Sequence, residues 1–427
     1  MAGRAANRRV VAVITDGLRR DLVTPELTPT IAALRAKGTW FGAHRSVFPS
    51  CTRVVSSSFS TGCLPSKHGL AGNSVCLVDE GKLVLHDVGK PEFVDEKRRL
   101  TGRVLNRPTL AERLADSGGG IVFNNVSPGA AYMHDPDGHG YVYHRAGSYG
   151  PGRKRIEGED ELQVIQGPEG DTDAANRFTT EVVRERKPAY ALLWLSEPDT
   201  TQHKVSLGSP QHKEVLAATD RNVATVLAAV EDCRRAGEDI LLIVGSDHGH
   251  ETVSAVIDIA AELVAAGLKQ GLASTDVVVA PNGTGALVYV DPSQQDRIEE
   301  IGRFLEAQPW SGKVFPRDRL AEAGLPSDPG LAFGVAMASN ETRNEYGIPG
   351  SSFAVSAAGG KSKPPGCGQH GGLGRYEQSP YLIVEGADFA PGAEVEAPTS
   401  AIDIAPTILR FLGQPEEELD GRALQGD

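Results

Sequence analysis

Apolar runs alternate with amphipathic stretches along most of the chain. Residues 10–15 form a continuous, mainly β-branched run, which predicts a strand buried on both faces. Similar runs predict strands at 120–125, 189–196, 239–246 and 380–386. Helical periodicity or capping residues predict helices at 28–38, 173–186, 210–235 and 399–413, and a further helix that begins at Thr109. This alternation predicts an α/β fold with a mostly parallel central sheet sandwiched by helices.

Three stretches interrupt the alternation. Residues 74–105 and 128–170 are rich in glycine, proline and charge, and we expect long loops or hairpins over one edge of the sheet. Residues 254–365 contain paired apolar runs, a helical pattern at 294–307 and a tract rich in glycine and proline. We therefore predict an inserted α+β cap domain at 254–365, between two parts of a core at 1–253 and 366–427.

The composition is that of a globular protein with an acidic surface. Of the 427 residues, 40% are hydrophobic and 23% are charged, and the formal net charge is −13. That charge argues against a nucleic acid polymer as a partner, because such partners select basic surfaces. It does not exclude a small anionic substrate, since bound metal ions can reverse the local field.

Cysteine usage and hydropathy bear on the compartment. The five cysteines are an odd number without a C-x-x-C pair, so we expect reduced thiols in a cytoplasmic protein. No segment approaches the ~20 apolar residues that span a bilayer, and the first apolar run is too short for a signal peptide. We expect no membrane partner, and a homo-oligomer is compatible with the sequence.

Four short polar segments follow predicted strands or lie in loops. They are ITDG (14–17), EPDTTQH (197–203), GSDHGH (245–250) and GQHGG (368–372). Open α/β sheets place their ligands at the carboxyl ends of the strands, so these segments are expected to meet. Together they supply three aspartates and three histidines: Asp16, Asp199, His203, Asp247, His248 and His370.

This residue set predicts two divalent metal ions. Each segment alone has an ordinary structural interpretation, such as a turn at Asp16 or a solvated helix face at Asp199 and His203. Six ligands are enough for two ions with positions left open for substrate. Mixed Asp and His ligands favour zinc, with manganese or iron as alternatives, over magnesium or calcium. Two such ions would clamp the attacking and leaving oxygens of an in-line displacement.

A candidate nucleophile lies in the stretch VFPSCTRVVSSSFSTG (47–62). Ser50, Cys51 and Thr52 are adjacent at the expected start of a helix of small residues. A helix N-terminus favours anion binding, because its backbone N–H groups and its dipole face the ligand. The residue types alone do not choose among the three.

The set of motifs resembles the alkaline phosphatase superfamily and, within it, the nucleotide pyrophosphatase/phosphodiesterase branch. The resemblance covers 9–75, 188–252 and 366–414, and its longest motif is FPSCTRVVSSSFSTGCLPSKHGLAGN (48–73). It implies an alkaline phosphatase-like fold, Thr52 as nucleophile and Asn73 as a phosphoryl contact. It also implies two ligand sets: Asp199, His203 and His370 for one ion, and Asp16, Asp247, His248 and Thr52 for the other.

The resemblance implies a two-metal hydrolase that cleaves phosphodiester or nucleotide pyrophosphate bonds through a phosphothreonyl intermediate. Alternatives are a phosphonate C–P hydrolase of the phosphonoacetate type, a phosphomonoesterase, and an inactive member whose metals only organise a binding surface. A sulfatase is disfavoured, because Cys51 is not followed by the C-x-P-x-R pattern.

The chain departs from the family where substrate binds. Nucleotide-cleaving members flank the nucleoside with two aromatic residues, and the corresponding positions here are Arg53 and Trp194. We predict both as substrate-binding residues. If Arg53 faces the pocket, it favours a small phospho- or phosphono-compound with additional negative charge. We also expect His250, two residues beyond a predicted ligand, to order Asp247 or His248.

Overall fold

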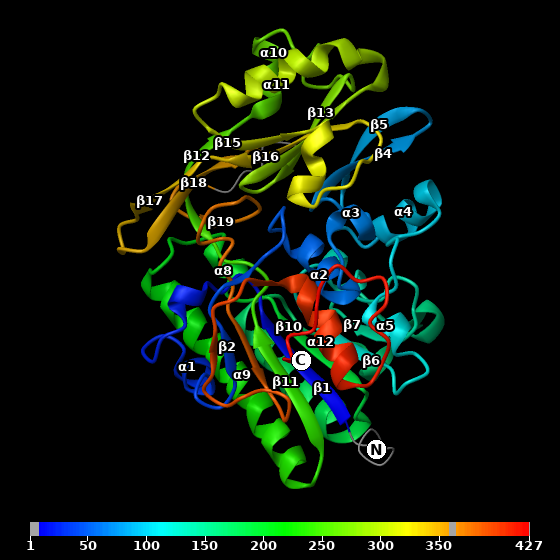
Figure 1. Ribbon diagram of the computed structural model, residues 1–427, viewed down its shortest axis with the longest axis vertical. Coiled ribbons are helices and arrows are strands. Elements are labelled where there is room, and N and C mark those ends of the chain that lie inside the picture. Colours follow the sequence, from blue (N-terminus) through cyan, green and yellow to red (C-terminus); the bar gives the residue numbers. More distant parts are fainter. Residues whose placement is uncertain (1–7, 358–363, 427) are drawn as a thin grey trace.

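The computed structural model describes residues 8–357 and 364–426. A ten-stranded sheet lies in the lower part of the molecule in Figure 1, with the longest parallel strands in its middle and antiparallel pairings on both sides of them. The strand order is β21 (Glu394–Val395), β2 (Thr39–Phe41), β20 (Leu382–Glu385), β11 (Asp239–Gly245), β1 (Arg8–Thr15), β10 (Tyr190–Leu195), β6 (Gly120–Asn124), β7 (Tyr141–Tyr143), β8 (Ser148–Gly150) and β9 (Lys154–Ile156).

Helices cover both faces of this sheet, as the sequence predicts. Alternate residues of β1 enter different cores: Val10, Ala12 and Ile14 belong to one, and Val11 and Val13 to the other. The first core is completed by α2 (Thr52–Thr61), α5 (Leu110–Arg113), α6 (Pro128–Tyr132) and α12 (Ile404–Phe411). The second is completed by α1 (Pro29–Leu34), α7 (Pro168–Arg177) and α9 (Pro210–Arg235).

The upper part of the molecule in Figure 1 contains smaller sheets. One is fully antiparallel, in the order β13 (Val277–Asn282), β14 (Gly285–Val290), β16 (Leu331–Met337) and β15 (Ser311–Pro316), and it packs with α10 (Ile259–Ala265) and α11 (Ile298–Glu306). Another joins β17 (Ser339–Arg343), β18 (Pro349–Val355), β12 (Glu251–Ile257) and β19 (Gly368–Gln369).

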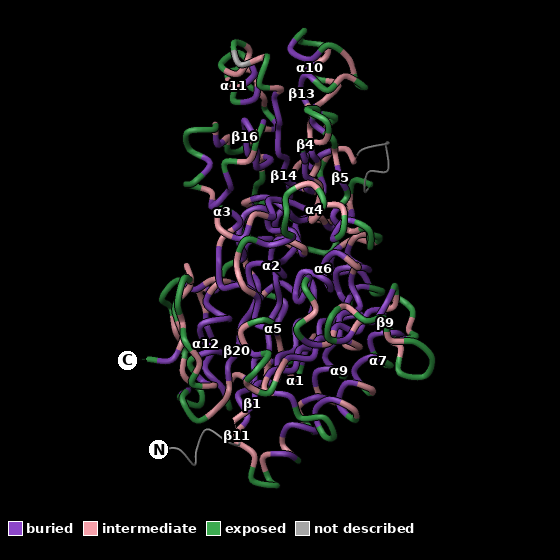
Figure 2. Tube along the Cα trace, turned by 90° about the vertical axis from the view of Figure 1, so that its right-hand side faces the viewer, coloured by how far each residue is buried: buried purple, intermediate pink, exposed green. Residues whose placement is uncertain are grey.

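The smaller sheets are not separated from the main core. Leu287 and Tyr289 of β14 belong to the same apolar cluster as Ile14 of β1. Buried residues accordingly continue from the central sheet past α2 to β14 (Figure 2). The cap boundary at 254–365 therefore stays a prediction, and part of its final tract, 358–363, lies outside the described residues.

Several elements differ from their predicted form. The expected helix at 28–38 is α-helical only at Pro29–Leu34, and the helical stretch 173–186 is α7 continued by a π-helix at Phe178–Arg186. The stretch 74–105 contains a hairpin, as predicted, of β4 (Ser74–Asp79) and β5 (Lys82–Asp87), and then a helix that was not predicted, α4 (Phe93–Thr101). No described helix is both long and apolar enough to cross a lipid bilayer.

Candidate metal centre

The predicted ligands meet beyond the carboxyl ends of three neighbouring strands. Asp16 follows β1, and Asp247 and His248 follow β11, which pairs with β1 in parallel. Asp199 begins α8 (Asp199–Gln202), shortly after β10 on the other side of β1. His370 comes from the segment after β19. The prediction that these side chains converge is therefore supported by the arrangement of the sheet.

The first group of side chains surrounds the Nε2 atom of His248. This atom lies 3.4 Å from Asp16 Oδ1, 3.1 Å from Asp247 Oδ2 and 3.1 Å from Thr52 Oγ1. The other oxygen of each aspartate has a donor: Trp194 Nε1–H donates to Asp16 Oδ2 at 2.9 Å, and the N–H of Gly17 donates to Asp247 Oδ1 at 3.0 Å. Asp16 Oδ1 and Asp247 Oδ2 are buried without a hydrogen-bond donor among the described residues.

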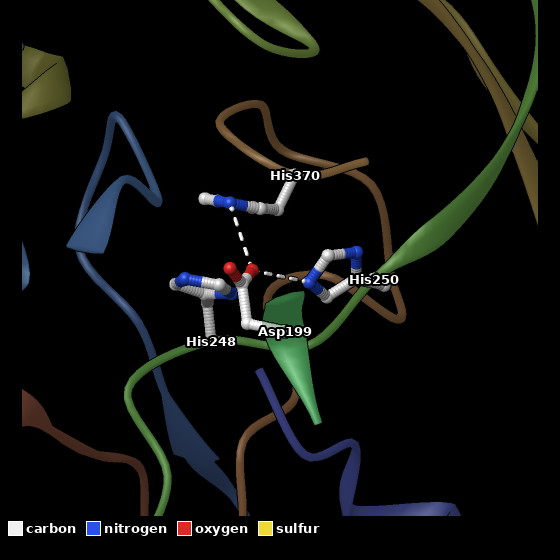
Figure 3. A group of neighbouring side chains, drawn as sticks. All are labelled: Asp199, His248, His250 and His370. Carbon is white, nitrogen blue, oxygen red and sulfur yellow. Dashed lines mark hydrogen bonds and ion pairs between the residues drawn. The ribbon is translucent and has the colours of Figure 1, made fainter. Parts of the chain in front are cut away.

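The second group converges on Asp199 Oδ1. His203 Nε2 lies 3.3 Å from this oxygen, His370 Nε2 lies 3.4 Å from it and His250 Nε2 lies 2.8 Å from it. Figure 3 shows the Asp199 carboxylate between His250 and His370, with His248 on the remaining side. The rings of His248 and His370 are stacked with their centroids 3.6 Å apart, so the two groups adjoin.

Backbone carbonyl groups fix the tautomers of three histidines. Nδ1–H of His203 donates to the Gly368 carbonyl at 3.1 Å, that of His248 to Gly249 at 3.1 Å and that of His370 to Ser50 at 2.7 Å. A carbonyl oxygen only accepts, so Nδ1 carries the proton and Nε2 of the neutral ring presents a lone pair. This is the usual arrangement of a metal-binding histidine.

The arrangement therefore fits metal ions. In both groups, Nε2 lone pairs of imidazoles face carboxylate oxygens, and no proton lies between the two acceptor atoms. Two buried acceptors that face each other are unfavourable unless a cation lies between them. Ligands ~2.0–2.2 Å from a tetrahedral zinc ion are separated by ~3.3 Å. The distances of Nε2 from the facing oxygens, 3.1–3.4 Å for His203, His248 and His370, match that separation.

The pKa shifts indicate the same demand for positive charge. Burial raises the pKa of Asp16 well above its usual value, and the charges of Asp247 and Asp199 raise it further. Burial is the largest single influence on the pKa of His248 and lowers it, but the charge and hydrogen bond of Asp247 and the charge of Asp199 together outweigh burial and raise that pKa. Burial opposes ionisation of Asp199 as well, yet the surrounding imidazoles, His203 foremost, hold the pKa of this carboxyl group well below its usual value.

His250 differs from the three other histidines. Its Nδ1 is buried and has no partner among the described residues, while its Nε2 contacts Asp199. A carboxylate oxygen only accepts in its ionised form, so Nε2–H of His250 donates to it. We expected His250 to order Asp247 or His248. The residue that it contacts is instead Asp199.

The three adjacent candidate nucleophiles have different surroundings. Ser50 Oγ donates toward the Gly372 carbonyl and Glu377 and accepts from the N–H of Gly371, so it belongs to a scaffold. Burial raises the pKa of Cys51 to about 12, which disfavours a thiolate. Thr52, the first residue of α2, is the one whose side-chain oxygen contacts a predicted metal-ligand histidine, His248.

A cleft of about 840 Å³ opens above these residues. Its walls include Thr52, Asn73, Asp199, His203 and His370. Asn73 Oδ1 accepts from the N–H of Arg53 at 3.3 Å, which leaves its side-chain N–H groups available to a ligand.

Of the two predicted substrate-binding residues, only Arg53 lines this cleft. Burial lowers the pKa of its guanidinium, against the raising effect of Asp87. Trp194 is 0% exposed and packs against Phe59 in the core. The prediction that Trp194 contacts substrate is therefore wrong, because its side chain points from β10 toward α2 and its Nε1–H holds Asp16.

Asn282 is a cleft residue that sequence reasoning missed. Its Oδ1 accepts from the N–H groups of Asn73 at 2.6 Å and Ser74 at 3.2 Å, which fixes the loop carrying Asn73. It lies at the end of β13, inside the region expected to be a cap. The Pro-Asn-Gly sequence there signals only a turn, so nothing in the local pattern indicates a role in the site.

Comparison with protein families extends these observations. A model of type I phosphodiesterases/nucleotide pyrophosphatases matches residues 10–315, which includes most of the chain. The chain belongs to this family. It is therefore an enzyme of the phosphodiesterase/nucleotide pyrophosphatase family with a buried Asp/His site suited to metal. A search among curated proteins finds no match.

Solved structures of family members share the fold. Murine ectonucleotide pyrophosphatase/phosphodiesterase 5 has a TM-score of 0.68 and 18% identity, and the alignment covers 97% of both chains. An inactive variant of that protein in complex with AMP gives a TM-score of 0.69 at 17% identity, again over 97% of both chains. The human protein gives 0.64 at 16%, with the same coverage.

Proposed function

We propose that this phosphodiesterase family member hydrolyses phosphodiester or nucleotide pyrophosphate bonds with Thr52 as the nucleophile. The observation that carries the proposal is the position of Thr52 Oγ1, 3.1 Å from His248 Nε2 and at the edge of the cleft. His248 in turn faces one unpaired oxygen of Asp16 and one of Asp247. The AMP bound to the murine relative supports a nucleotide-like substrate.

Two divalent ions fit the groups described above. One would be held by Asp16, Asp247, His248 and Thr52, and the other by Asp199, His203 and His370. When bound, they would favour ionisation of the Thr52 hydroxyl and neutralise charge on the phosphoryl and leaving oxygens. Zinc is proposed because the ligands mix imidazole and carboxylate.

The protein's own residues would then carry out an in-line displacement. Thr52 Oγ forms a bond to phosphorus while the bond to the leaving oxygen breaks, and that oxygen departs with the electron pair. Asn73 donates its side-chain N–H to a non-bridging oxygen, an interaction that in comparable oxyanion sites is worth ~3 kcal/mol. Water then attacks phosphorus and loses a proton, the bond between phosphorus and Thr52 Oγ breaks with its electron pair on Oγ, and Oγ takes up a proton to restore Thr52.

Turnover of three substrates by metal-loaded protein tests the reaction class. Bis(p-nitrophenyl) phosphate, p-nitrophenyl phosphate and phosphonoacetate represent a diester, a monoester and a phosphonate. We expect the highest kcat/KM for the diester. A higher value for either other substrate would replace the proposal by a phosphomonoesterase or a C–P hydrolase.

Thr52→Ala tests the nucleophile. We expect it to lower kcat by at least ~10³-fold, because the intermediate cannot form. Thr52→Ser, which keeps a hydroxyl, is the matched control and should retain part of the activity. Full turnover by Thr52→Ala would contradict the assignment.

The compartment is a separate proposal. All five cysteines are buried and none forms a disulfide bond, which fits the cytoplasmic location expected from the sequence.

A further inference from the structure

The Arg53 guanidinium carries a charge that the protein leaves unpaired. Its Nε–H donates to Ser127 Oγ at 3.2 Å, which directs the group along the cleft wall. Its two terminal nitrogens have no hydrogen-bond or ion-pair partner among the described residues. The space they occupy depends on Gly89, where an added Cβ would lie 2.2 Å from Arg53 Nη2.

Three arginines of α4 and of the turn before β9 (Lys154–Ile156) are paired with carboxylates, unlike Arg53. Arg98 binds Asp137 at 2.6 Å, Arg99 binds Asp79 at 2.9 Å and Arg153 binds Asp95 at 2.7 Å. In a chain with a net charge of −13, carboxylates are available to pair with most cations. A half-buried guanidinium without one is costly unless a ligand supplies the missing charge.

A second free cation lies on the same wall. Lys90 also lines the cleft, is adjacent to Gly89 and forms no side-chain hydrogen bond or ion pair with any described residue. The acidic residue of this wall, Asp87, accepts the N–H of Gly89 at 2.8 Å and does not bind Arg53 directly. The wall therefore offers guanidinium and ammonium donors to an anion.

The aromatic rings that line the cleft are imidazoles, those of His86, His203 and His370. None of the described residues that line it is Phe, Tyr or Trp, although its volume of about 840 Å³ is far larger than a phosphoryl group needs. The polar and charged side chains of the lining, Arg53 and Lys90 among them, are therefore available to recognise a substrate arm in this space. The donors of Arg53 suit planar carboxylate and phosphate oxygens in particular.

We propose that Arg53, with Lys90 beside it, binds a second anionic group, a carboxylate or a phosphate, on the substrate arm attached to the reacting phosphorus. The inference rests on the proposed function, since it places the reacting phosphoryl group at Thr52. It assigns the enzyme to substrates with two separated anionic groups.

Matched diesters with one leaving group test the subsite. Three phosphodiesters are compared, each with p-nitrophenol as one alcohol and a different second arm: 2-carbamoylethyl, 2-carboxyethyl or 2-phosphoethyl. The carbamoyl arm is neutral and nearly isosteric with the carboxyl arm. Their binding to metal-loaded Thr52→Ala protein is measured by calorimetry, with and without Arg53→Gln. We expect the charged arms to bind about tenfold to a hundredfold more tightly than the neutral arm, and Arg53→Gln to remove most of this preference.

Two further variants separate the outcomes. Lys90→Gln should reduce the preference by a smaller factor. Lys82→Gln, an exposed change at the start of β5 and outside the cleft lining, should leave the preference unchanged. A preference for one charged arm over the other identifies the anion as carboxylate or phosphate. Equal binding of neutral and charged arms, or a preference that survives Arg53→Gln, would overturn the subsite.

The same experiments distinguish a failure of the proposed phosphodiesterase activity from a failure of the proposed anion subsite. Release of p-nitrophenolate by the protein with Thr52 intact reports hydrolysis, whereas calorimetry on Thr52→Ala reports recognition. Hydrolysis of all three diesters without a charge preference would refute the subsite and leave the phosphodiesterase activity. Charge-selective binding without hydrolysis would refute the proposed activity and leave the subsite.

Discussion

The metal centre and the cleft wall above it are built in different ways. The aspartates of the metal centre follow strands that are packed on both faces. Asp16 after β1 and Asp247 after β11 each have one carboxylate oxygen held by a hydrogen bond. The wall around Arg53 is made from a hairpin, loops and the end of β13, with exposed residues such as Lys90. The chemical step thus depends on rigid core elements, whereas recognition depends on segments that can vary without disturbing the core.

The largest expected effect is at Asp16, in the metal centre. Asp16→Asn keeps the shape and an acceptor for Trp194 but removes the charge that faces His248. We expect kcat/KM on bis(p-nitrophenyl) phosphate to fall by at least ~10³-fold with loss of one ion per chain, measured by metal analysis.

The same variant should have the opposite effect on the metal-free protein. Because burial and Asp247 raise the pKa of Asp16, its charge is unfavourable there, and the asparagine should raise the apo Tm at neutral pH. Unchanged activity with full metal content would show that the centre does not depend on this carboxylate.

A smaller effect is expected at His250, which donates to Asp199. His250→Leu should weaken binding of the ion held by Asp199 by about tenfold to a hundredfold, as measured with a competing chelator. His250→Gln is the matched control, because its amide N–H can replace Nε2–H as the donor. If leucine and glutamine weakened the ion equally, the hydrogen bond to Asp199 would not be the reason.

Glu251 gives a pH-dependent prediction outside both regions. Burial and the neighbouring Glu377 raise the pKa of Glu251 to about 8 from 4.5. The folded protein then binds more protons than the unfolded chain between these values, so the free energy of unfolding falls as pH rises through this window, by at most ~1.4 kcal/mol per pH unit. Glu251→Gln should be more stable than the parent at pH 8 and similar at pH 4, in urea unfolding.

The smallest effect is expected on the cleft wall itself. Gly89→Ala places a methyl group where Arg53 Nη2 lies, and the flexible guanidinium must move aside. We expect KM to change by about threefold for a substrate with a charged arm, with kcat and Tm nearly unchanged. A large loss of kcat or of metal would mean that the wall and the metal centre are mechanically connected.

The sequence predicted the parts of the site that the central sheet controls. The apolar runs that became β1, β10 and β11 located the ends where Asp16, Asp199 and Asp247 are found. The parallel pairing of these strands follows from their alternation with helices, and it was sufficient to predict that the ligands converge.

The sequence did not predict which way individual side chains face. Trp194 lies in a strand that is apolar throughout, so no alternation distinguishes a residue facing the core from one near the cleft. The partner of His250 and the role of Asn282 depend on contacts between segments far apart in the chain. Such contacts leave no periodic signal in the sequence.

The ligands of the metal centre come from nearly the whole length of the chain, from Asp16 in the first turn after β1 to His370 in the segment after β19. A nascent polypeptide emerging from the ribosome therefore cannot complete either group before most of its residues have been synthesised: His248 is needed for one and His370 for the other. Loading with both ions should consequently be a late event, and a translation product that ends before His370 should lack at least the ion of the second group.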